Sequence, residues 1–323
     1  MKNLILSFNF SKLTGDVSPK FTSFEEKLQL YLSAFEDGYN LAKQKFPKHR
    51  IILLTHEYAI TKANPSNSKI LDYSEHLRIQ ERLKEFTRVN QNCVIIFPYA
   101  FAKEYQNEYQ FPKLLKMAQR YQENSHKKSA YTVEQEDFEN YLNKSQTNNS
   151  DHTITVVRNV CYLLSGGIVL NKVDKRVPCF EYTLPNSSTV RAPLVQGSTL
   201  FQPGTNRNII SLNKTQSLAI EICADHASGL LKSTWKPNKS PATYHLILAD
   251  STSLNTKNLI GKFNILCDAI TGTSLIQQKG MDKKEAPIVI AIKPEFNEGL
   301  LEYTHKYVKP EILTDSAISL SPK

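Results

Sequence analysis

Short apolar runs that alternate with segments of helical periodicity constrain the fold of this chain more than any other feature. A first strand is predicted over residues 3–9, and the runs Ile51–Thr55 and Cys93–Phe97 have the pattern of strands buried on both faces. Ser23 and Glu26 form a capping-box signature that opens a helix after the first strand. A second helix is predicted over Tyr73–Val89. This β-α-β-α-β order predicts an α/β layered fold.

The rest of the chain continues the β pattern after a polar interruption. Residues 103–152 are predicted to form a surface insertion, within which the polar stretch Glu123–Asp151 is expected to be exposed and mobile. A hairpin over His152–Val173, strands over Ser217–Ile222 and Tyr244–Ala249, and a short helix near 226–232 follow. A strand-like segment spans 286–292, and the remaining tail is predicted to be irregular. We therefore expect a single domain over 1–323, with an atypical C-terminal segment from about residue 256.

Charge and hydropathy exclude several classes of protein. Forty Lys and Arg residues against 31 Asp and Glu residues give a formal net charge of +9, but the basic residues are dispersed and predict a solvated surface. The apolar run 93–102 contains Pro98 and is too short to span a bilayer. The apolar stretch Leu4–Phe10 is predicted to be a strand and not a signal peptide. We expect no nucleic-acid partner and no membrane contact.

The five cysteines are widely scattered, and no CxxC pair occurs. Zinc ribbons and thioredoxin-like redox motifs therefore have no support, and no metal site is expected. An odd, sparse set of thiols is typical of a reducing compartment, so a cytoplasmic location is predicted, with secretion that needs no cleavable signal left open. Four of the five are most simply packing residues: Cys93, Cys161, Cys179 and Cys267.

Chemically reactive side chains lie at the ends of apolar runs. Glu57 follows the run that begins at Ile51, Lys175 follows the strand that begins at Gly167, and Cys223 follows Leu218–Ile222. The carboxyl ends of strands are where α/β folds place catalytic groups. A neighbouring Lys favours the thiolate form of a Cys, and a Glu can accept and return its proton. A carboxylate, an ammonium and a thiol at one sheet edge would form a site for covalent catalysis.

These segments read HEYAI at 56–60, GIVLNKVDK at 167–175 and EICADH at 221–226, with Phe201–Gly204 as an F-x-P-G turn before the last. Arg158-Asn159 precedes the hairpin, and Leu246–Ser251 follows the Cys strand in the expected order. From about residue 3 to 255 the chain resembles the nitrilase, or carbon–nitrogen hydrolase, superfamily. The resemblance implies a four-layer α-β-β-α sandwich, with no cofactor.

Carried onto this sequence, the resemblance implies Glu57 as general base, Lys175 as stabiliser of the tetrahedral intermediate and Cys223 as nucleophile. It also implies Glu181 as an auxiliary residue and the amide of Ala224 as an oxyanion donor. Lys172 is a rival for the lysine, but a count of eight residues from Gly167 selects Lys175. His226 is expected to orient the start of a helix or to face substrate. Three further neighbours are expected to be structural: His56, Asp225 and Asn159.

Two departures from the family pattern are visible at the motifs. His56 replaces the usual Pro, and Ala224 replaces the usual aromatic residue after the nucleophile. The segment Ile265–Ile276 lacks the family's usual helix-and-strand pattern, which leaves homodimer formation and substrate specificity open.

We predict a cysteine-dependent, amidase-like hydrolase of non-peptide C–N bonds in a small amide or carbamoyl compound, with a nitrile as the less favoured substrate. It would work through a thioester acyl-enzyme. One alternative is a catalytically silent protein of the same fold that binds or regulates. Another, based only on the charge of +9, is a protein that binds polyanions.

Overall fold

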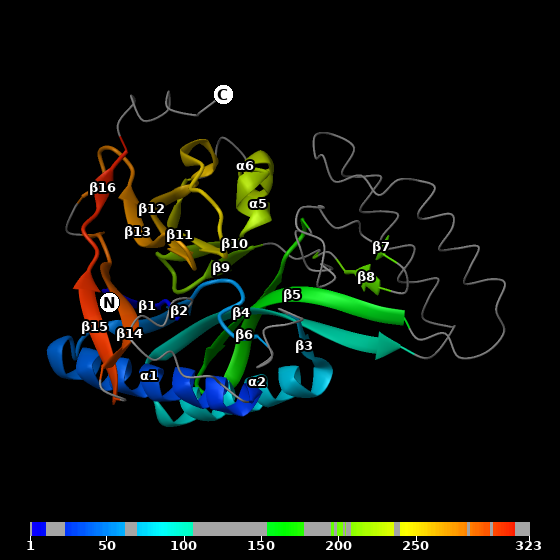
Figure 1. The fold of residues 1–323 in the computed structure, drawn as a ribbon. Coiled ribbons are helices and arrows are strands. Elements are labelled where there is room, and N and C mark those ends of the chain that lie inside the picture. The colour runs from blue at the N-terminus through cyan, green and yellow to red at the C-terminus, as the bar shows by residue number, and fades with distance from the viewer. Residues whose placement is uncertain are drawn as a thin grey trace, which may run out of the picture.

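The computed structural model describes residues 2–10, 23–61, 70–105, 154–177, 195–196, 199–202, 204, 208–235, 240–282, 285–297 and 300–313. These residues form two β-sheets that stack face to face (Figure 1). The predicted insertion at 103–152, apart from its first three residues, and the stretch Glu123–Asp151 lie outside the described residues.

The larger sheet has parallel strands at its centre and antiparallel strands on both flanks. Its order is β15 (Leu300–Tyr307), β14 (Ile288–Asn297), β1 (Asn3–Phe8), β2 (Arg50–Thr55), β4 (Cys93–Tyr105), β5 (Ile154–Ser165), β8 (Thr199–Phe201) and β7 (Val195–Gln196). Two strands lie off this path: β3 (Ile70–Asp72) pairs with β4, and β6 (Ile168–Asp174) pairs with β5.

The smaller sheet carries the segment predicted to hold the nucleophile. Its order is β16 (Glu311–Ile312), β13 (Gly272–Gln277), β12 (Gly261–Asp268), β11 (Ala242–Ala249), β10 (Ser217–Ile222) and β9 (Ile209–Ser211). Strands β10, β11 and β12 are parallel, so their carboxyl ends meet at one edge of the sheet.

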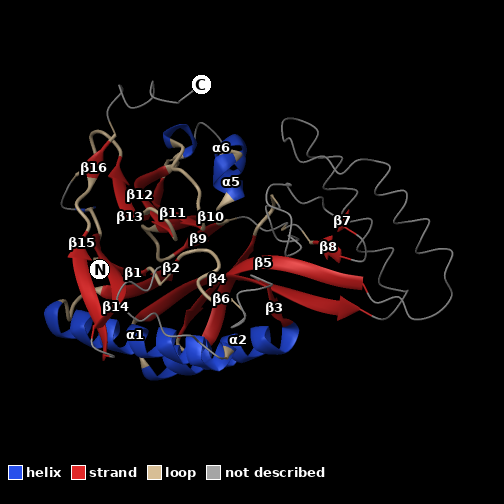
Figure 2. Cartoon of the chain, viewed as in Figure 1, coloured by secondary structure: helices blue, strands red, loops and turns tan. Residues whose placement is uncertain are grey.

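Helices cover the outer faces of both sheets (Figure 2). Helices α1 (Phe24–Lys45) and α2 (Tyr73–Val89) lie along the larger sheet, and α1 begins with the predicted capping box of Ser23 and Glu26. The short helices α5 (Ala224–Ala227) and α6 (Leu230–Thr234) follow β10, and the 3-10 helix η2 (Thr256–Asn258) follows β11. No helix among the described residues is long and apolar enough to cross a membrane.

Strand alternation divides the apolar residues that the structure describes among three cores. On β1, Leu4, Leu6 and Phe8 pack against the helices, whereas Ile5 points into the core between the sheets. On β10, Leu218 faces that central core and Ala219 packs against Leu231 of α6. Successive side chains of a strand point to opposite faces, so each sheet serves two cores. The predicted α-β-β-α sandwich is confirmed.

Two features of the fold bear on the sequence predictions. The tail was expected to be irregular, and this was wrong for the described part: β15 pairs with β14 over eight residue pairs, and β16 joins the smaller sheet. The atypical segment after residue 256 therefore supplies strands to both sheets.

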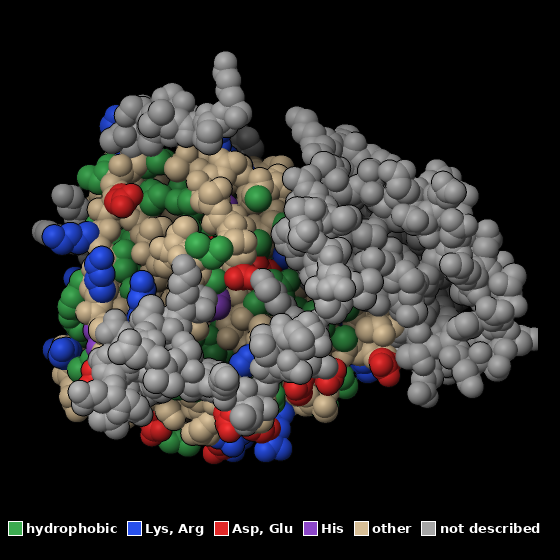
Figure 3. All heavy atoms as spheres, in the orientation of Figure 1, with side chains coloured by type: hydrophobic (Ala, Val, Ile, Leu, Met, Phe, Trp, Pro, Cys, Tyr) green, Lys and Arg blue, Asp and Glu red, His purple; other side chains and the backbone are tan. Residues whose placement is uncertain are grey.

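On the face drawn in Figure 3, basic and acidic side chains intermingle over the helical layer. In that layer Arg78 of α2 pairs with Glu25 of α1 at 2.5 Å.

Candidate active site

The three predicted catalytic residues each follow a strand. Glu57 lies just after β2, Lys175 just after β6 and Cys223 just after β10, so both sheets contribute to the site. All three are buried, with exposed fractions of 0%, 1% and 7%. Charged side chains are buried this deeply only when they have partners.

Glu57 and Lys175 form a buried ion pair. Lys175 Nζ donates to Glu57 Oε1 at 2.8 Å, and Asn159 Nδ2 donates to the same oxygen at 2.7 Å. The amide of Lys175 is bound to the carbonyl of Asn159 at 2.8 Å, so one residue orients both members of the pair. Asn159 was expected to be structural only, and its direct contact with Glu57 is a part of the site that sequence reasoning missed.

The rival lysine, Lys172, lies elsewhere. Its Nζ is 3.1 Å from Asp174 Oδ2, and its side chain is 26% exposed. Asp174 also binds Arg158 at 2.7 Å. The residue at the strand end, Lys175, is therefore the one that reaches Glu57.

Cys223 occupies a tight turn between β10 and α5. Its backbone φ of 45° and ψ of −104° form a conformation that residues other than glycine rarely adopt, at a cost of about 1–3 kcal/mol. Its amide donates to the carbonyl of Leu248 at 2.9 Å, and its Sγ lies 2.8 Å from Thr252 Oγ1. Strain of this kind persists where the surroundings fix it.

Burial raises the pKa of the Cys223 thiol, and the charge and hydrogen bond of Glu57 raise it further. The Lys175 ammonium and the Thr252 hydroxyl act in the opposite direction but do not outweigh burial. The expected lowering of the pKa by Lys175 is therefore present, but it is smaller than the rise caused by burial and by the charge of Glu57. The resting sulfur is a thiol, and it needs a base beside it before it can attack.

Two further predicted residues have a clear outcome, and one has none. Ala224 is the first residue of α5, next to the nucleophile and 5% exposed. His226 is fully buried: its Nδ1 lies 2.9 Å from Glu221 Oε2, and its Nε2 accepts from the amide of Asn255 at 3.2 Å. Glu181 lies outside the described residues.

Glu221, His226 and His245 form a buried cluster whose donor set a metal ion could use. Glu221 Oε2 lies 2.9 Å from His226 Nδ1 and 3.0 Å from His245 Nε2. The other ring nitrogens accept from backbone amides, those of Asn255 and Ile260, so the ring protons point at Glu221. Burial opposes the charge of Glu221, but these hydrogen bonds outweigh it and lower its pKa to about 2. The cluster is a closed hydrogen-bond network that braces the Cys223 turn.

Asp225 connects the elements that carry Lys175 and Cys223. Its buried carboxylate accepts from the amide of Arg176 at 3.0 and 3.1 Å and from the amide of Val177 at 2.7 Å. It was expected to be structural, and its contacts hold the segment after Lys175 against the start of α5. Lys175 is fixed from a second side by Gly204, whose amide donates to the Lys175 carbonyl at 2.9 Å.

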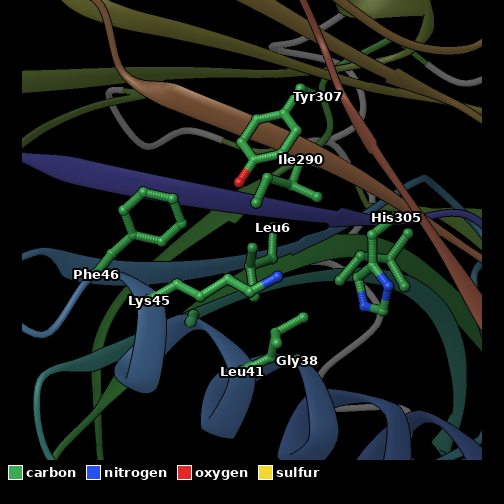
Figure 4. A pocket seen from close by; sticks show the side chains of 10 residues that line it. Leu6, Gly38, Leu41, Lys45, Phe46, Ile290, His305 and Tyr307 are labelled. Carbon is green, nitrogen blue, oxygen red and sulfur yellow. The ribbon is translucent and has the colours of Figure 1, made fainter.

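A small apolar hollow lies far from these groups, between α1 and strands β1, β14 and β15 (Figure 4). Its volume is about 30 Å³, and Leu6, Ile290 and Phe46 are among its lining residues. It opens on the helical side of the larger sheet, whereas Cys223 belongs to the core between the sheets. The hollow is therefore separate from the site.

No family model and no curated protein matches the chain. Among solved structures it is similar to the NitN amidase of Nesterenkonia sp. AN1, at 11% identity and a TM-score of 0.45, over 98% of this chain and 94% of that one. It is also similar to a carbon–nitrogen hydrolase of Helicobacter pylori G27, at 8% identity and a TM-score of 0.40, over 94% and 79%.

A third similar structure is the glutamine-dependent NAD+ synthetase of Acinetobacter baumannii, at 12% identity and a TM-score of 0.35 over 74% of this chain. This chain spans about a third, 32%, of the length of that synthetase. A further structure of the Nesterenkonia amidase is described as a member of the nitrilase superfamily. The motifs of this chain, HEYAI, GIVLNKVDK and EICADH, resemble that superfamily as well.

Proposed function

We propose that the chain is a cysteine-dependent hydrolase that cleaves a non-peptide C–N bond through a thioester intermediate. One observation carries the proposal. Glu57 and Lys175 form a fully buried ion pair at 2.8 Å, and both lie close enough to the Cys223 thiol to shift its pKa. A base, a cation and a thiol in one buried site provide the groups that acyl transfer needs. A buried ion pair is a poor source of stability, which favours a role in chemistry.

In the first half-reaction, Glu57 takes the proton of the Cys223 thiol as the sulfur forms a bond to the substrate carbonyl carbon. The Lys175 ammonium and the Ala224 amide stabilise the oxygen that becomes negative. Glu57 then gives the proton to the leaving nitrogen, the C–N bond breaks and the amine departs. The acyl group remains on sulfur as a thioester.

In the second half-reaction, Glu57 takes a proton from water as the water oxygen attacks the thioester carbon. The C–S bond breaks, the carboxylic acid leaves, and the sulfur takes the proton back from Glu57. One water is consumed for each bond cleaved. The residues described here supply every proton transfer, so the proposed cycle uses no cofactor.

We propose a small amide or carbamoyl compound as substrate. Attack on a carbonyl places negative charge on oxygen, which suits the Lys175 ammonium and the Ala224 amide better than the nitrogen of a nitrile would. Homodimer formation and a cytoplasmic location stay predictions from the sequence.

Intact-mass spectrometry after incubation with a panel of amides, carbamoyl compounds and nitriles tests the proposal. The expected result is an acyl adduct on the wild-type protein that disappears in Cys223→Ser, with amine and acid released over time. Lys175→Met should abolish turnover, whereas the matched control Lys172→Met should keep it, because Lys172 pairs with Asp174 outside the site. If no compound forms an adduct or is hydrolysed, the proposal fails and the catalytically silent alternative replaces it.

A further inference from the structure

A hydroxyl group that belongs to none of the predicted catalytic motifs touches the sulfur of Cys223. Thr252 Oγ1 lies 2.8 Å from Cys223 Sγ, and Thr252 belongs to the loop that follows β11. The contact joins residues 29 positions apart, across neighbouring parallel strands. Thr252 was not among the residues that the motifs pointed to.

The Thr252 loop is held in place by a single carboxylate. Asp268, at the end of β12, accepts from the amide of Ser251 at 2.8 Å and from the amide of Thr252 at 3.0 Å through Oδ2. Its Oδ1 accepts from the amides of Ile270 and Thr271 at 2.9 and 2.7 Å. Burial opposes the charge of Asp268, but these bonds outweigh it and lower its pKa. The anchor is therefore charged, and the loop fixed, at neutral pH.

Ser251 shows that the loop shape is imposed from outside. Its φ is 88°, a value that a serine rarely adopts. Its own amide and the amide of Thr252 both donate to Oδ2 of Asp268. The strain orients the next residue, Thr252, toward the turn that carries Cys223. A side chain that only fills space would not need this arrangement.

We propose that Thr252 is a further catalytic residue, whose hydroxyl donates a hydrogen bond to the sulfur of Cys223 when the sulfur carries negative charge. This inference rests on the proposed function. In the resting thiol, either the sulfur or the oxygen can be the donor. Once the thiol proton has moved to Glu57, the sulfur can only accept, and the Thr252 hydroxyl becomes the donor.

The contact is thus stronger in the charged state than in the neutral one, which is the condition for a rate effect. Three groups face the sulfur from three elements: Glu57 after β2, Lys175 after β6 and Thr252 after β11. Lys175 and Thr252 favour the thiolate, and Glu57 disfavours it. Thr252 is the one whose removal changes no formal charge.

The test is the pH dependence of Cys223 alkylation by iodoacetamide, followed by peptide mass mapping, in Thr252→Val, which keeps the shape and removes the hydroxyl. The profile should move to higher pH, with labelling at neutral pH slowed about tenfold or more, the size of a hydrogen bond to a charged group. Thr252→Ser should restore the wild-type profile. Ser253→Ala, at the exposed neighbouring residue, is the matched control and should change nothing.

Thr252→Ala provides a second hydroxyl-free variant if the valine does not fold, with circular dichroism as the check. Identical profiles for the wild type and a folded hydroxyl-free variant would overturn the inference. The assay needs no substrate, so its outcome is separate from that of the proposed function. A Thr252-dependent profile without turnover of any amide supports the contact and rejects the hydrolase, whereas turnover unaffected by loss of the hydroxyl rejects the role of Thr252.

Discussion

Removing the ammonium of Lys175 should greatly lower the free energy of unfolding. Removing the Glu57 carboxylate at the same time should cancel much of that loss. The two side chains are fully buried, with 2.8 Å between Nζ and Oε1. Lys175→Met leaves the Glu57 carboxylate in the core without its counter-charge, and Glu57→Gln does the same to the ammonium. The Asn159 amide still donates to residue 57, but it carries no charge.

Breaking a buried pair from one side costs about 3–5 kcal/mol, whereas replacing both members by neutral groups of similar volume is often close to neutral. Each single variant should therefore lose about 3–5 kcal/mol of unfolding free energy. The double variant should lose no more than either single one, so its loss should fall below the sum of the two single losses by at least about 3 kcal/mol. For Lys172→Met the loss should be about 1 kcal/mol or less, because that pair is partly exposed and Arg158 still neutralises Asp174.

Urea unfolding of the four proteins and the wild type, at one pH and salt concentration, measures these differences. Single losses that simply add in the double variant would refute the direct interaction between Glu57 and Lys175. A loss in Lys172→Met as large as that in Lys175→Met would refute the assignment of the buried lysine. In activity the pattern should be similar, since residues that act as a unit give non-additive effects: the double variant should be barely slower than either single one.

Three other outcomes follow from the same contacts. Peptide mapping should find Cys223 alkylated before the three fully buried described cysteines, and Lys175→Met should slow that labelling; a core cysteine labelled first would contradict the assignment. Gly204→Ala should lower the free energy of unfolding, measured in urea, by about 1–3 kcal/mol, because its Cβ would lie 2.3 Å from the Asp174 carbonyl oxygen; an unchanged free energy would show that this close approach is dispensable. Glu221 has its pKa lowered from 4.5 to about 2, so the stability of about 3 kcal/mol present above pH 4.5 should disappear as pH falls toward 2, and Glu221→Gln should flatten that dependence.

The amino-acid sequence by itself determined the layered fold and the order of the reactive groups. Short apolar runs have the pattern of buried strands, and Ser23 with Glu26 specifies where α1 begins. Glu57 and Cys223 stand out because a reactive side chain at the end of an apolar strand is visible in the pattern alone. These are local signals, which depend on residues close together in the chain.

The tertiary structure alone decided which other groups complete the site. Asn159 reaches Glu57 across 102 positions, Asp225 reaches the Lys175 segment across 48, and Thr252 reaches Cys223 across 29. Such contacts depend on which strands become neighbours and on how the two sheets stack. The hydrophobic periodicity of the sequence specifies neither the strand order nor the stacking. His226 shows the same limit, since the sequence left open whether it orients the start of a helix or faces substrate, and its partner Glu221 was not predicted. Alternate residues of a strand point to opposite faces, so Glu221 of β10 points away from the central core that Ile220 and Ile222 join, and His226 of α5 binds it there.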